Sequence, residues 1–408
     1  MGRLREYDVL VLASLLWFLA KFFRYAFPPL FEPLQAAYSV SNAAVGTAFT
    51  GFMLVYALMQ FPSGVLADRI GAVRVIVGGA SIAGLGALAV VFDTPFLVLA
   101  AVMLVIGAGT GAHKTVAIRL LSRVYPTRTG RALGAHDTVG AFGGVVAPAA
   151  VVLFLAAPSA FDIVLSRLPG ADWRGLFLLS GVVALVLAAG FAYRVPDRLP
   201  ATADHESQGD EAAQTPGLTE YASLFRDPRM TTFVVVTVAF SFAYNGVVAF
   251  LPLYLSQAAG LPTATASLLY SALFTATFVQ LVSGDLSDRL GRFPVMVATL
   301  GIGSIALVGV VVLAGRGAAV LGLLVVALGL GSHGFRPVRG AYLVEALPDR
   351  LAGGGLGVVR TLLMGAGALA PSIVGISADT VGFRPAFGLL AASMGIAAVL
   401  TAALWLTK

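Results

Sequence analysis

Five basic side chains and one acidic side chain stand inside long apolar stretches of the sequence. A Lys, Arg or Asp near the centre of a bilayer costs about 2.5 to 3.5 kcal/mol on insertion scales, so each of these residues is a candidate for function. They are Lys21, Arg24, Lys114, Asp137, Arg336 and Arg360. With five cations against one carboxylate, an aqueous cavity lined by these side chains would carry a positive potential and favour anions.

The arginines suit the recognition of an oxyanion better than the lysines. A guanidinium presents a planar fork that binds a carboxylate through two parallel hydrogen bonds, so we expect Arg24 and Arg360 to bind the anionic group jointly. We expect the remaining cations to supply an attractive field, and these are Lys21, Lys114 and Arg336. Asn245, in the centre of its apolar stretch, is a further polar group that faces either a ligand or another helix.

A second group of residues has the chemistry of proton transfer. His136 and Asp137 are adjacent, and Lys114 lies at a matching depth in the preceding apolar stretch. Because histidine titrates near neutrality, His136 with Asp137 is a candidate proton carrier, and Asp137 is expected to pair with Lys114 in at least one state. The alternative for His136 is a hydrogen bond at a contact between helices. Arg119 and Arg339 lie nearer the ends of their stretches and are expected to snorkel.

The composition indicates what positions these residues. The 408 residues are 58% hydrophobic and only 11% charged, and the mean hydropathy is +0.92. A soluble domain has roughly 45 to 50% apolar and about 25% charged residues, so this chain is expected to lie in a lipid bilayer. Its net charge of +6 fits the basic loops of a membrane protein. The sequence has no basic run with interleaved aromatic residues outside the apolar stretches, so we do not expect it to bind nucleic acid. The absence of cysteine and the four scattered histidines predict no metal site.

Twelve apolar runs are long enough to cross about 30 Å of hydrocarbon as helices. The expected spans are 9–31, 42–66, 73–92, 95–119, 131–157, 174–193, 231–255, 264–284, 293–314, 317–340, 354–377 and 385–406. The basic residues of the connections gather on the side of both termini, so the termini are expected to be cytoplasmic. Six spans lie in 1–195 and six in 230–408, and 196–229 reads as an acidic flexible linker.

One motif occurs twice. GVLADRIGAVR, from Gly64 to Arg74, returns as GDLSDRLGRFP, from Gly284 to Pro294. Equivalent residues of the two copies are a constant 220 positions apart. Gly64, Asp68, Arg69 and Gly71 of the first copy correspond to Gly284, Asp288, Arg289 and Gly291 of the second. Glycine permits a tight reversal of the chain, and the aspartate is expected to bind free N–H groups at the start of a neighbouring helix. Two homologous halves of six helices are expected to share a cavity and to rock around it.

These features resemble the major facilitator superfamily of secondary transporters. The twelve spans, the 6+6 division, the acidic central segment and the two copies of the loop signature G-x-L-a-D-r-x-G-r-k/r carry the resemblance, although Ala72 stands where a basic residue is usual. The context of Arg24, KFFRYAFPPLFEPL, is similar to the organic-anion branch, in which an arginine of the first helix meets a substrate carboxylate. We expect the loops to form a gate, with Asp68 capping the helix near Gly353 and Asp288 capping the one near Arg131.

The sequence thus predicts an all-α polytopic membrane protein of two pseudo-symmetric six-helix bundles. We expect a carrier of a small anion, an organic carboxylate or a similar oxyanion, driven by a proton or sodium gradient and acting as a monomer without cofactor in the plasma membrane. The main alternative is a multidrug/proton antiporter, but such members usually show Gly-Pro-Gly-Gly on span five, where this chain has GAFGGVVAP. No GxxxxGK[ST], HExxH or other catalytic motif is found, so we expect no enzyme.

Overall fold

A computed structural model describes residues 7–155, 173–196, 224–347 and 352–407. These residues contain no strand, and twelve of their helical segments are long and apolar enough to cross a membrane. The prediction of an all-α fold with twelve spans is therefore confirmed. The predicted linker 196–229 falls mainly on residues 197–223, outside the described residues.

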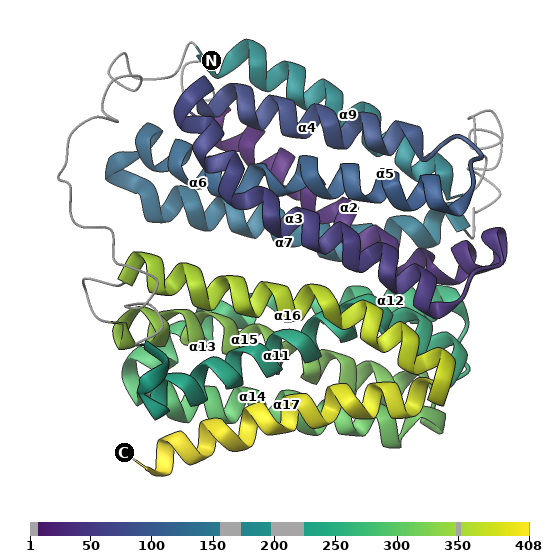
Figure 1. Ribbon diagram of the computed structural model, residues 1–408, viewed down its shortest axis with the longest axis vertical. Helices are drawn as coiled ribbons and strands as arrows, with labels where there is room; N and C mark the ends of the chain where they lie inside the picture. The colour runs from purple at the N-terminus through teal and green to yellow at the C-terminus, as the bar shows by residue number, and fades with distance from the viewer. Residues whose placement is uncertain (1–6, 156–172, 197–223, 348–351, 408) are drawn as a thin grey trace. The chain divides into compact units, whose positions relative to one another are not determined.

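The chain forms two compact units (Figure 1). The N-terminal unit comprises Met1–Ser39 and Gly51–Glu211, and the C-terminal unit comprises Val40–Thr50 and Ala212–Lys408. Residues 40–50 are thus grouped with the second unit although they open a helix that continues in the first.

Six spans begin before the predicted linker, and the fourth consists of two consecutive helices. Their helices are α2 (Asp8–Tyr38), α3 (Asn42–Ile70), α4 (Ala72–Ala89), α5 (Phe96–Gly111), α6 (His113–Val124), α7 (Thr129–Leu155) and α9 (Arg174–Arg194), with a short 3-10 helix at Pro126–Arg128. In the N-terminal unit, α2 packs along α7 and α9, and α4 packs along α5 and α9. The predicted binding and proton-coupling residues of this unit lie on α2, α6 and α7.

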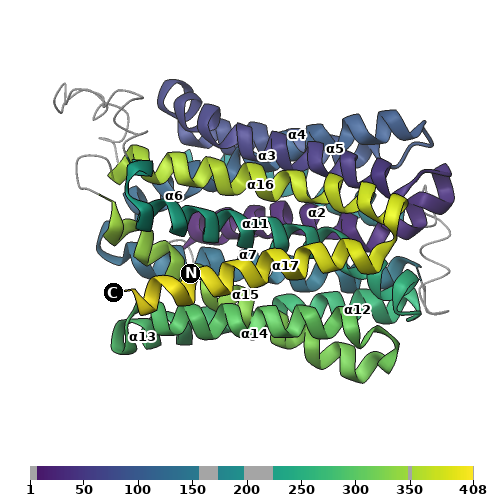
Figure 2. The same ribbon diagram turned by 60° about the horizontal axis from the view of Figure 1, so that its bottom comes forward.

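The C-terminal unit repeats this plan. Its helices are α11 (Pro228–Leu253), α12 (Thr263–Thr275), α13 (Val279–Leu290), α14 (Arg292–Val312), α15 (Ala318–Ala346), α16 (Ala352–Val381) and α17 (Phe383–Leu406). Short 3-10 helices lie at Leu224–Arg226, Ala276–Phe278 and Ala314–Arg316, and a π-helical segment at Tyr254–Ala258 continues α11. Helix α11 packs against α16 and α17, and α14 packs against α15 and α17. Figure 2 shows α11, α16 and α17 running side by side.

Helix α2 is longer than the sequence predicted. The expected span ended at residue 31, yet the helix continues through Pro28, Pro29 and Pro33 to Tyr38 and ends at Ser39, whose φ is 52°. A proline inside a helix removes one hydrogen bond, but the cost is offset where tight packing holds the segment. Here Phe27, Pro28, Pro29 and Leu30 are all buried.

The N-terminus of α3 is capped within the C-terminal unit. Asp379 lies near the end of α16, and its two carboxylate oxygens accept hydrogen bonds from the first backbone N–H groups of α3. The donors are Asn42 N, at 3.1 Å, and Ala43 N, at 2.8 Å. The side-chain amide of Asn42 donates a third, at 2.8 Å. A carboxylate at this position satisfies free N–H groups and the helix dipole, which explains why residues 40–50 belong to this unit.

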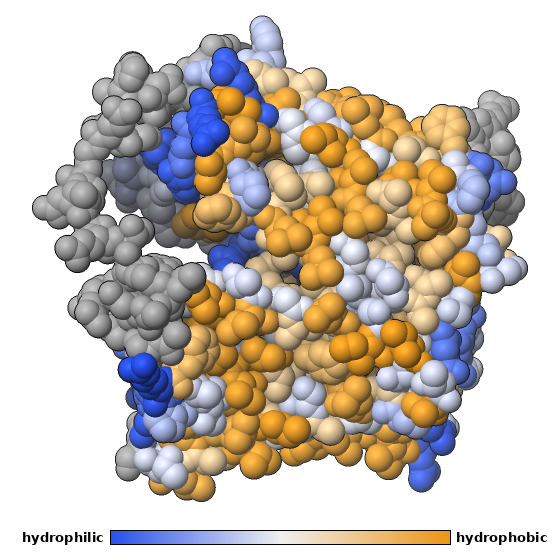
Figure 3. Space-filling model, viewed as in Figure 1, coloured by the Kyte–Doolittle hydropathy of each residue, from blue (hydrophilic) through white to orange (hydrophobic). Residues whose placement is uncertain are grey.

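The outer faces of the helices are apolar. Large side chains such as Phe61, Leu97, Leu281 and Ile305 are at least 74% exposed. On each unit in Figure 3, apolar residues cover the middle of the viewed face and hydrophilic residues gather towards the helix ends. Exposed apolar area of this extent is stable in lipid rather than in water.

Candidate functional site

An aromatic stack lies in the interior of the N-terminal unit. The ring centres of His113 on α6 and His136 on α7 each lie 6.0 Å from that of Trp17 on α2, and 5.7 Å from one another. All three side chains are buried. Three helices therefore meet at one cluster of rings, and Trp17, which the sequence analysis did not single out, lies at its centre.

Small residues and one hydrogen bond hold this stack in place. Gly140 of α7 faces the indole so closely that a Cβ there would overlap the Trp17 ring. His113 Nε2 lies 3.0 Å from the carbonyl oxygen of Ala13, one turn before Trp17 on α2. Glycine on α7 thus lets α2 approach, and His113 fixes α6 against it.

The predicted cations of this unit lie around the stack. Lys21 Nζ is 5.0 Å and Lys114 Nζ is 5.4 Å from the centre of the Trp17 ring. The Arg24 guanidinium lies 5.6 Å from the ring of Tyr25 and 5.7 Å from that of Tyr56 on α3. Aromatic faces stabilise a nearby cation by about 0.5 to 2 kcal/mol, so these rings offset part of the cost of charge inside the unit. The structure thus brings Lys21 and Lys114 to one ring.

The predicted proton-coupling pair adjoins the same stack. His136 is buried, whereas the neighbouring Asp137 is exposed. His136 interacts electrostatically with both Asp137 and Lys114, which puts the three groups in one neighbourhood. The ion pair between Asp137 and Lys114, and the role of His136 in proton transfer, stay predictions.

The C-terminal unit has its own cations on aromatic rings. The Arg336 guanidinium lies 5.6 Å from the Tyr244 ring of α11. Arg339, one turn further along α15, lies 5.8 Å from the Phe240 ring and 6.0 Å from that of Phe335. The Nε atom of Arg339 is buried and has no hydrogen bond in the described residues, although the residue as a whole is half-buried, so its snorkelling stays a prediction.

The two other predicted residues of this unit are on α11 and α16. Arg360 is exposed on α16. Asn245 uses its side-chain amide in helix packing, because Nδ2 donates to the carbonyl oxygen of Ser241 at 2.8 Å. Ser241 Oγ in turn donates to the carbonyl oxygen of Leu363 on α16 at 2.6 Å. Contact of Arg360 or Asn245 with a solute stays a prediction.

The two repeated motifs are mainly helical, which corrects the expectation of a loop. Gly64 to Ile70 complete α3 and Gly284 to Leu290 complete α13, and the connection to the next helix is one residue in each half. These residues are Gly71, with φ 91°, and Gly291, with φ 92°. Only glycine adopts this backbone conformation without strain, so the shared spacing of the two copies reflects the turn itself.

The charged residues of the two copies make different contacts. Asp68 pairs with Arg119 of α6 at 2.8 Å, at the surface of the N-terminal unit, while Arg69 is exposed. In the second copy Arg289 pairs with Asp285 at 2.9 Å. Capping of helices in the opposite half by Asp68 and Asp288 stays a prediction.

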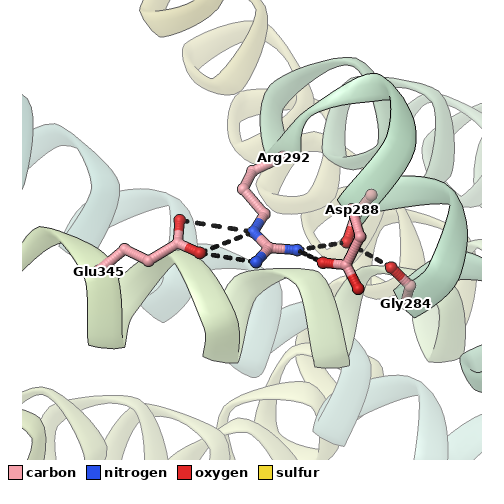
Figure 4. Close-up of polar contacts among 5 residues, drawn as sticks. Gly284, Asp288, Arg292 and Glu345 are labelled. Atoms are coloured by element: carbon pink, nitrogen blue, oxygen red, sulfur yellow. Dashed lines mark hydrogen bonds and ion pairs between the residues drawn. The ribbon is translucent and has the colours of Figure 1, made fainter.

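The second copy contains a larger network, centred on Arg292 (Figure 4). Arg292 pairs with Asp288 at 2.5 Å and with Glu345 of α15 at 2.6 Å, and donates to Ser287 Oγ at 2.8 Å. Ser287 Oγ donates to the carbonyl oxygen of Gly284 at 2.8 Å. Glu345 of α15 is thus bound to Arg292 of α14.

Twelve spans in two repeated bundles, with charged groups inside each bundle, define a polytopic transport protein. The sequence profile described as Major Facilitator Superfamily matches residues 13–332, and the chain belongs to this superfamily. Its members are transporters, so the chain is a transporter and not an enzyme.

Relatives with named substrates are distant. A probable sulfoacetate transporter of Cupriavidus necator is 28% identical over 62% of this chain, but the alignment covers only 56% of that protein. A 4-hydroxybenzoate transporter of Pseudomonas aeruginosa is 28% identical over 40% of this chain and 34% of its own length. A multidrug resistance protein of Escherichia coli is 26% identical over 68% of this chain and 65% of its own.

A solved structure shares the fold. The bacterial homologue of the human lysosomal transporter Spinster, solved in an inward-facing and unoccupied conformation, superimposes with a TM-score of 0.78. The match covers 98% of this chain and 95% of that chain at 17% identity, so it shows the fold alone.

Proposed function

We propose that the chain is a secondary active transporter of a small organic anion, a carboxylate or a similar oxyanion. The observation that carries the proposal is the excess of cations inside both units, with Lys21, Arg24 and Lys114 in one and Arg336 and Arg360 in the other. Four of these cations, Lys21, Arg24, Lys114 and Arg336, lie against aromatic rings of the protein, where an anion is attracted more strongly than in water. Two of the relatives are named as transporters of sulfoacetate and 4-hydroxybenzoate, which are anions.

Arg24 and Arg360 bind the anionic group in this proposal. Lysine at either position keeps the charge but loses the bidentate hydrogen bonds. The test is uptake of labelled carboxylates into proteoliposomes by Arg24→Lys and Arg360→Lys, with Arg316→Lys, at an exposed position between α14 and α15, as the matched control. We expect at least a tenfold loss of kcat/KM in the first two variants and none in the control. Wild-type kinetics in both would reject the site.

The driving force is a proton or sodium gradient, with His136 and Asp137 as the proton-coupling residues. A carboxylate that exchanges a cationic partner for water changes its proton affinity between states, as coupling requires. We further propose a monomer in the plasma membrane with both termini in the cytoplasm. Uptake under an imposed pH or sodium gradient distinguishes the two ions.

A second candidate is a multidrug/proton antiporter, because one relative is a multidrug resistance protein. Such a protein would expel cationic dyes, and for that cargo an interior dominated by Lys21, Arg24 and Arg336 is electrostatically unfavourable. Export of ethidium from proteoliposomes, with no transport of carboxylates, would favour this alternative.

A further inference from the structure

Arg339 stands apart from the other basic residues near the ends of the spans. Its guanidinium lies against the rings of Phe240 and Phe335, and its Nε atom is buried without a hydrogen bond in the described chain. Arg119 shows the contrast, because its side chain is 45% exposed and pairs with Asp68. Arg339 is half-buried, and its guanidinium is held against two aromatic rings of the C-terminal unit rather than in an ion pair.

No carboxylate of the described residues neutralises Arg339 or its neighbour Arg336. Glu345, two turns further along α15, is bound to Arg292 at 2.6 Å. The charges that act on Arg339 are those of Arg336 and Arg360, and both repel it. Removing a cation from water without a partner is costly, so this concentration of positive charge is stable only with an anion or water beside it.

The two guanidinium groups are placed to act on one ligand. Arg336 and Arg339 are three residues apart on α15, which puts them on neighbouring positions of one helical face. Each lies over an aromatic ring of α11, Tyr244 or Phe240. These rings restrict the side chains, so fewer rotamers are lost when an oxyanion binds.

We propose that Arg336 and Arg339 form a second anion-binding subsite, and that the transported solute therefore carries two separate anionic groups. The inference rests on the proposed function, in which Arg24 and Arg360 bind the first group. The solute class is a short dianion whose charges lie on different atoms of its skeleton, as in a dicarboxylate. A solute with one anionic group leaves this subsite without a counter-charge.

Two series of matched anions test the proposal on the purified full-length protein. The dianions malonate, succinate and glutarate are compared with the monoanions propionate, butyrate and pentanoate, and binding is measured by calorimetry in detergent. We expect the best dianion to bind at least tenfold tighter than the monoanion of the same length, because each ionic hydrogen bond lost is worth about tenfold or more. Equal affinity of the wild type for both members of every pair would overturn the subsite.

Variants separate the subsite from the remainder of the site. Arg339→Gln and Arg336→Gln should each weaken the dianion at least tenfold and the monoanion by a much smaller factor, whereas Arg316→Gln should change neither. Equal weakening of both classes would overturn the proposal. If a Gln variant does not fold, Arg339→Lys keeps the charge and should reduce the preference for the dianion by a smaller factor, and an unchanged preference would contradict it.

Two further outcomes concern the identity of the bound anion. If no anion of either series binds the wild type or is transported by it, the proposed function itself fails. If phosphatidylglycerol added to the detergent competes with the dianion and abolishes the dianion preference, the two arginines bind a lipid headgroup, and the subsite is overturned while the anion carrier stands.

Discussion

The two units carry cations at related places but with different chemistry. In the N-terminal unit lysines lie over Trp17, next to two stacked histidines. In the C-terminal unit arginines lie over Tyr244 and Phe240. Lysine and histidine release protons when their surroundings change, whereas arginine stays charged in a protein. Under the proposed function, His136 and Asp137 of the N-terminal unit exchange protons, and Arg336 and Arg339 of the C-terminal unit supply a permanent positive charge.

The largest expected effect separates these roles. Asp137→Asn should abolish accumulation of the solute against its gradient while counterflow exchange remains measurable, because the variant loses the carboxylate that takes up the proton. The measurement is uptake into proteoliposomes with and without an imposed pH gradient.

Arg336→Gln is the counterpart in the C-terminal unit. It should weaken binding of the solute but leave the response to the pH gradient intact. If both variants lose the pH response equally, the division of labour between the units is wrong. Loss of folding in Asp137→Asn alone would make this residue structural.

The next effect concerns how tightly a glycine packs against Trp17 in the N-terminal unit and against Asn245 and Ser241 in the C-terminal unit. A Cβ at Gly140 overlaps the rigid indole of Trp17, whereas a Cβ at Gly367 meets the movable side chains of Asn245 and Ser241. Overpacking costs about 1 to 3 kcal/mol, so Gly140→Ala should lower the Tm in detergent more than Gly367→Ala.

Matched controls exist in the same helices. Gly134 on α7 and Gly365 on α16 have open space where a Cβ would stand. Alanine at these positions should leave the Tm unchanged or raise it slightly, because alanine favours the helix. A control variant as unstable as Gly140→Ala would refute the packing argument.

A smaller effect distinguishes the two copies of the repeated motif. The side chain of Arg292 is 22% exposed in its contact with Glu345, whereas Arg119 and Asp68 are 45% and 44% exposed. A double-mutant cycle with Arg292→Gln and Glu345→Gln should give a coupling of about 1 kcal/mol, and the cycle for Asp68 and Arg119 less than about 0.5 kcal/mol. Equal couplings would mean that burial of Arg292 does not matter.

The smallest effect comes from converting one copy towards the other. Ala72 occupies the place that Arg292 has in the second copy. Ala72→Arg puts a basic residue four positions after Asp68 on the far side of Gly71, where the pair is worth a few tenths of a kcal/mol. We expect a rise in Tm of at most about 2 °C, measured by thermal unfolding at low salt, and none at high salt. A large rise would show that the absent arginine limits this unit.

The sequence predicts the helices well because their length is set by the bilayer. The spans starting at 42 and 174 begin within a residue of α3 and α9. The end of α2 is predicted seven residues too early, because Pro33 is locally unfavourable in a helix and the packing that compensates for it is a tertiary property.

The site is predictable in composition but not in contacts. Lys21, Arg24 and Lys114 are recognisable because charge is rare in apolar runs. Trp17 lies one turn before Lys21, and this spacing is the signal that would have included it. The partner of Glu345, by contrast, is 53 residues away on another helix. The contact of Arg339 with the Phe240 ring likewise depends on how α15 packs against α11, which the sequence alone does not specify.

The single-residue connections at Gly71 and Gly291 also determine how displacement passes along the chain. With one residue between them, α13 and α14 have no slack, and neither helix can slide along its axis without pulling the other. The same holds for α3 and α4. Each pair can change the angle between its two helices at the glycine, but the two helix ends that meet there stay together.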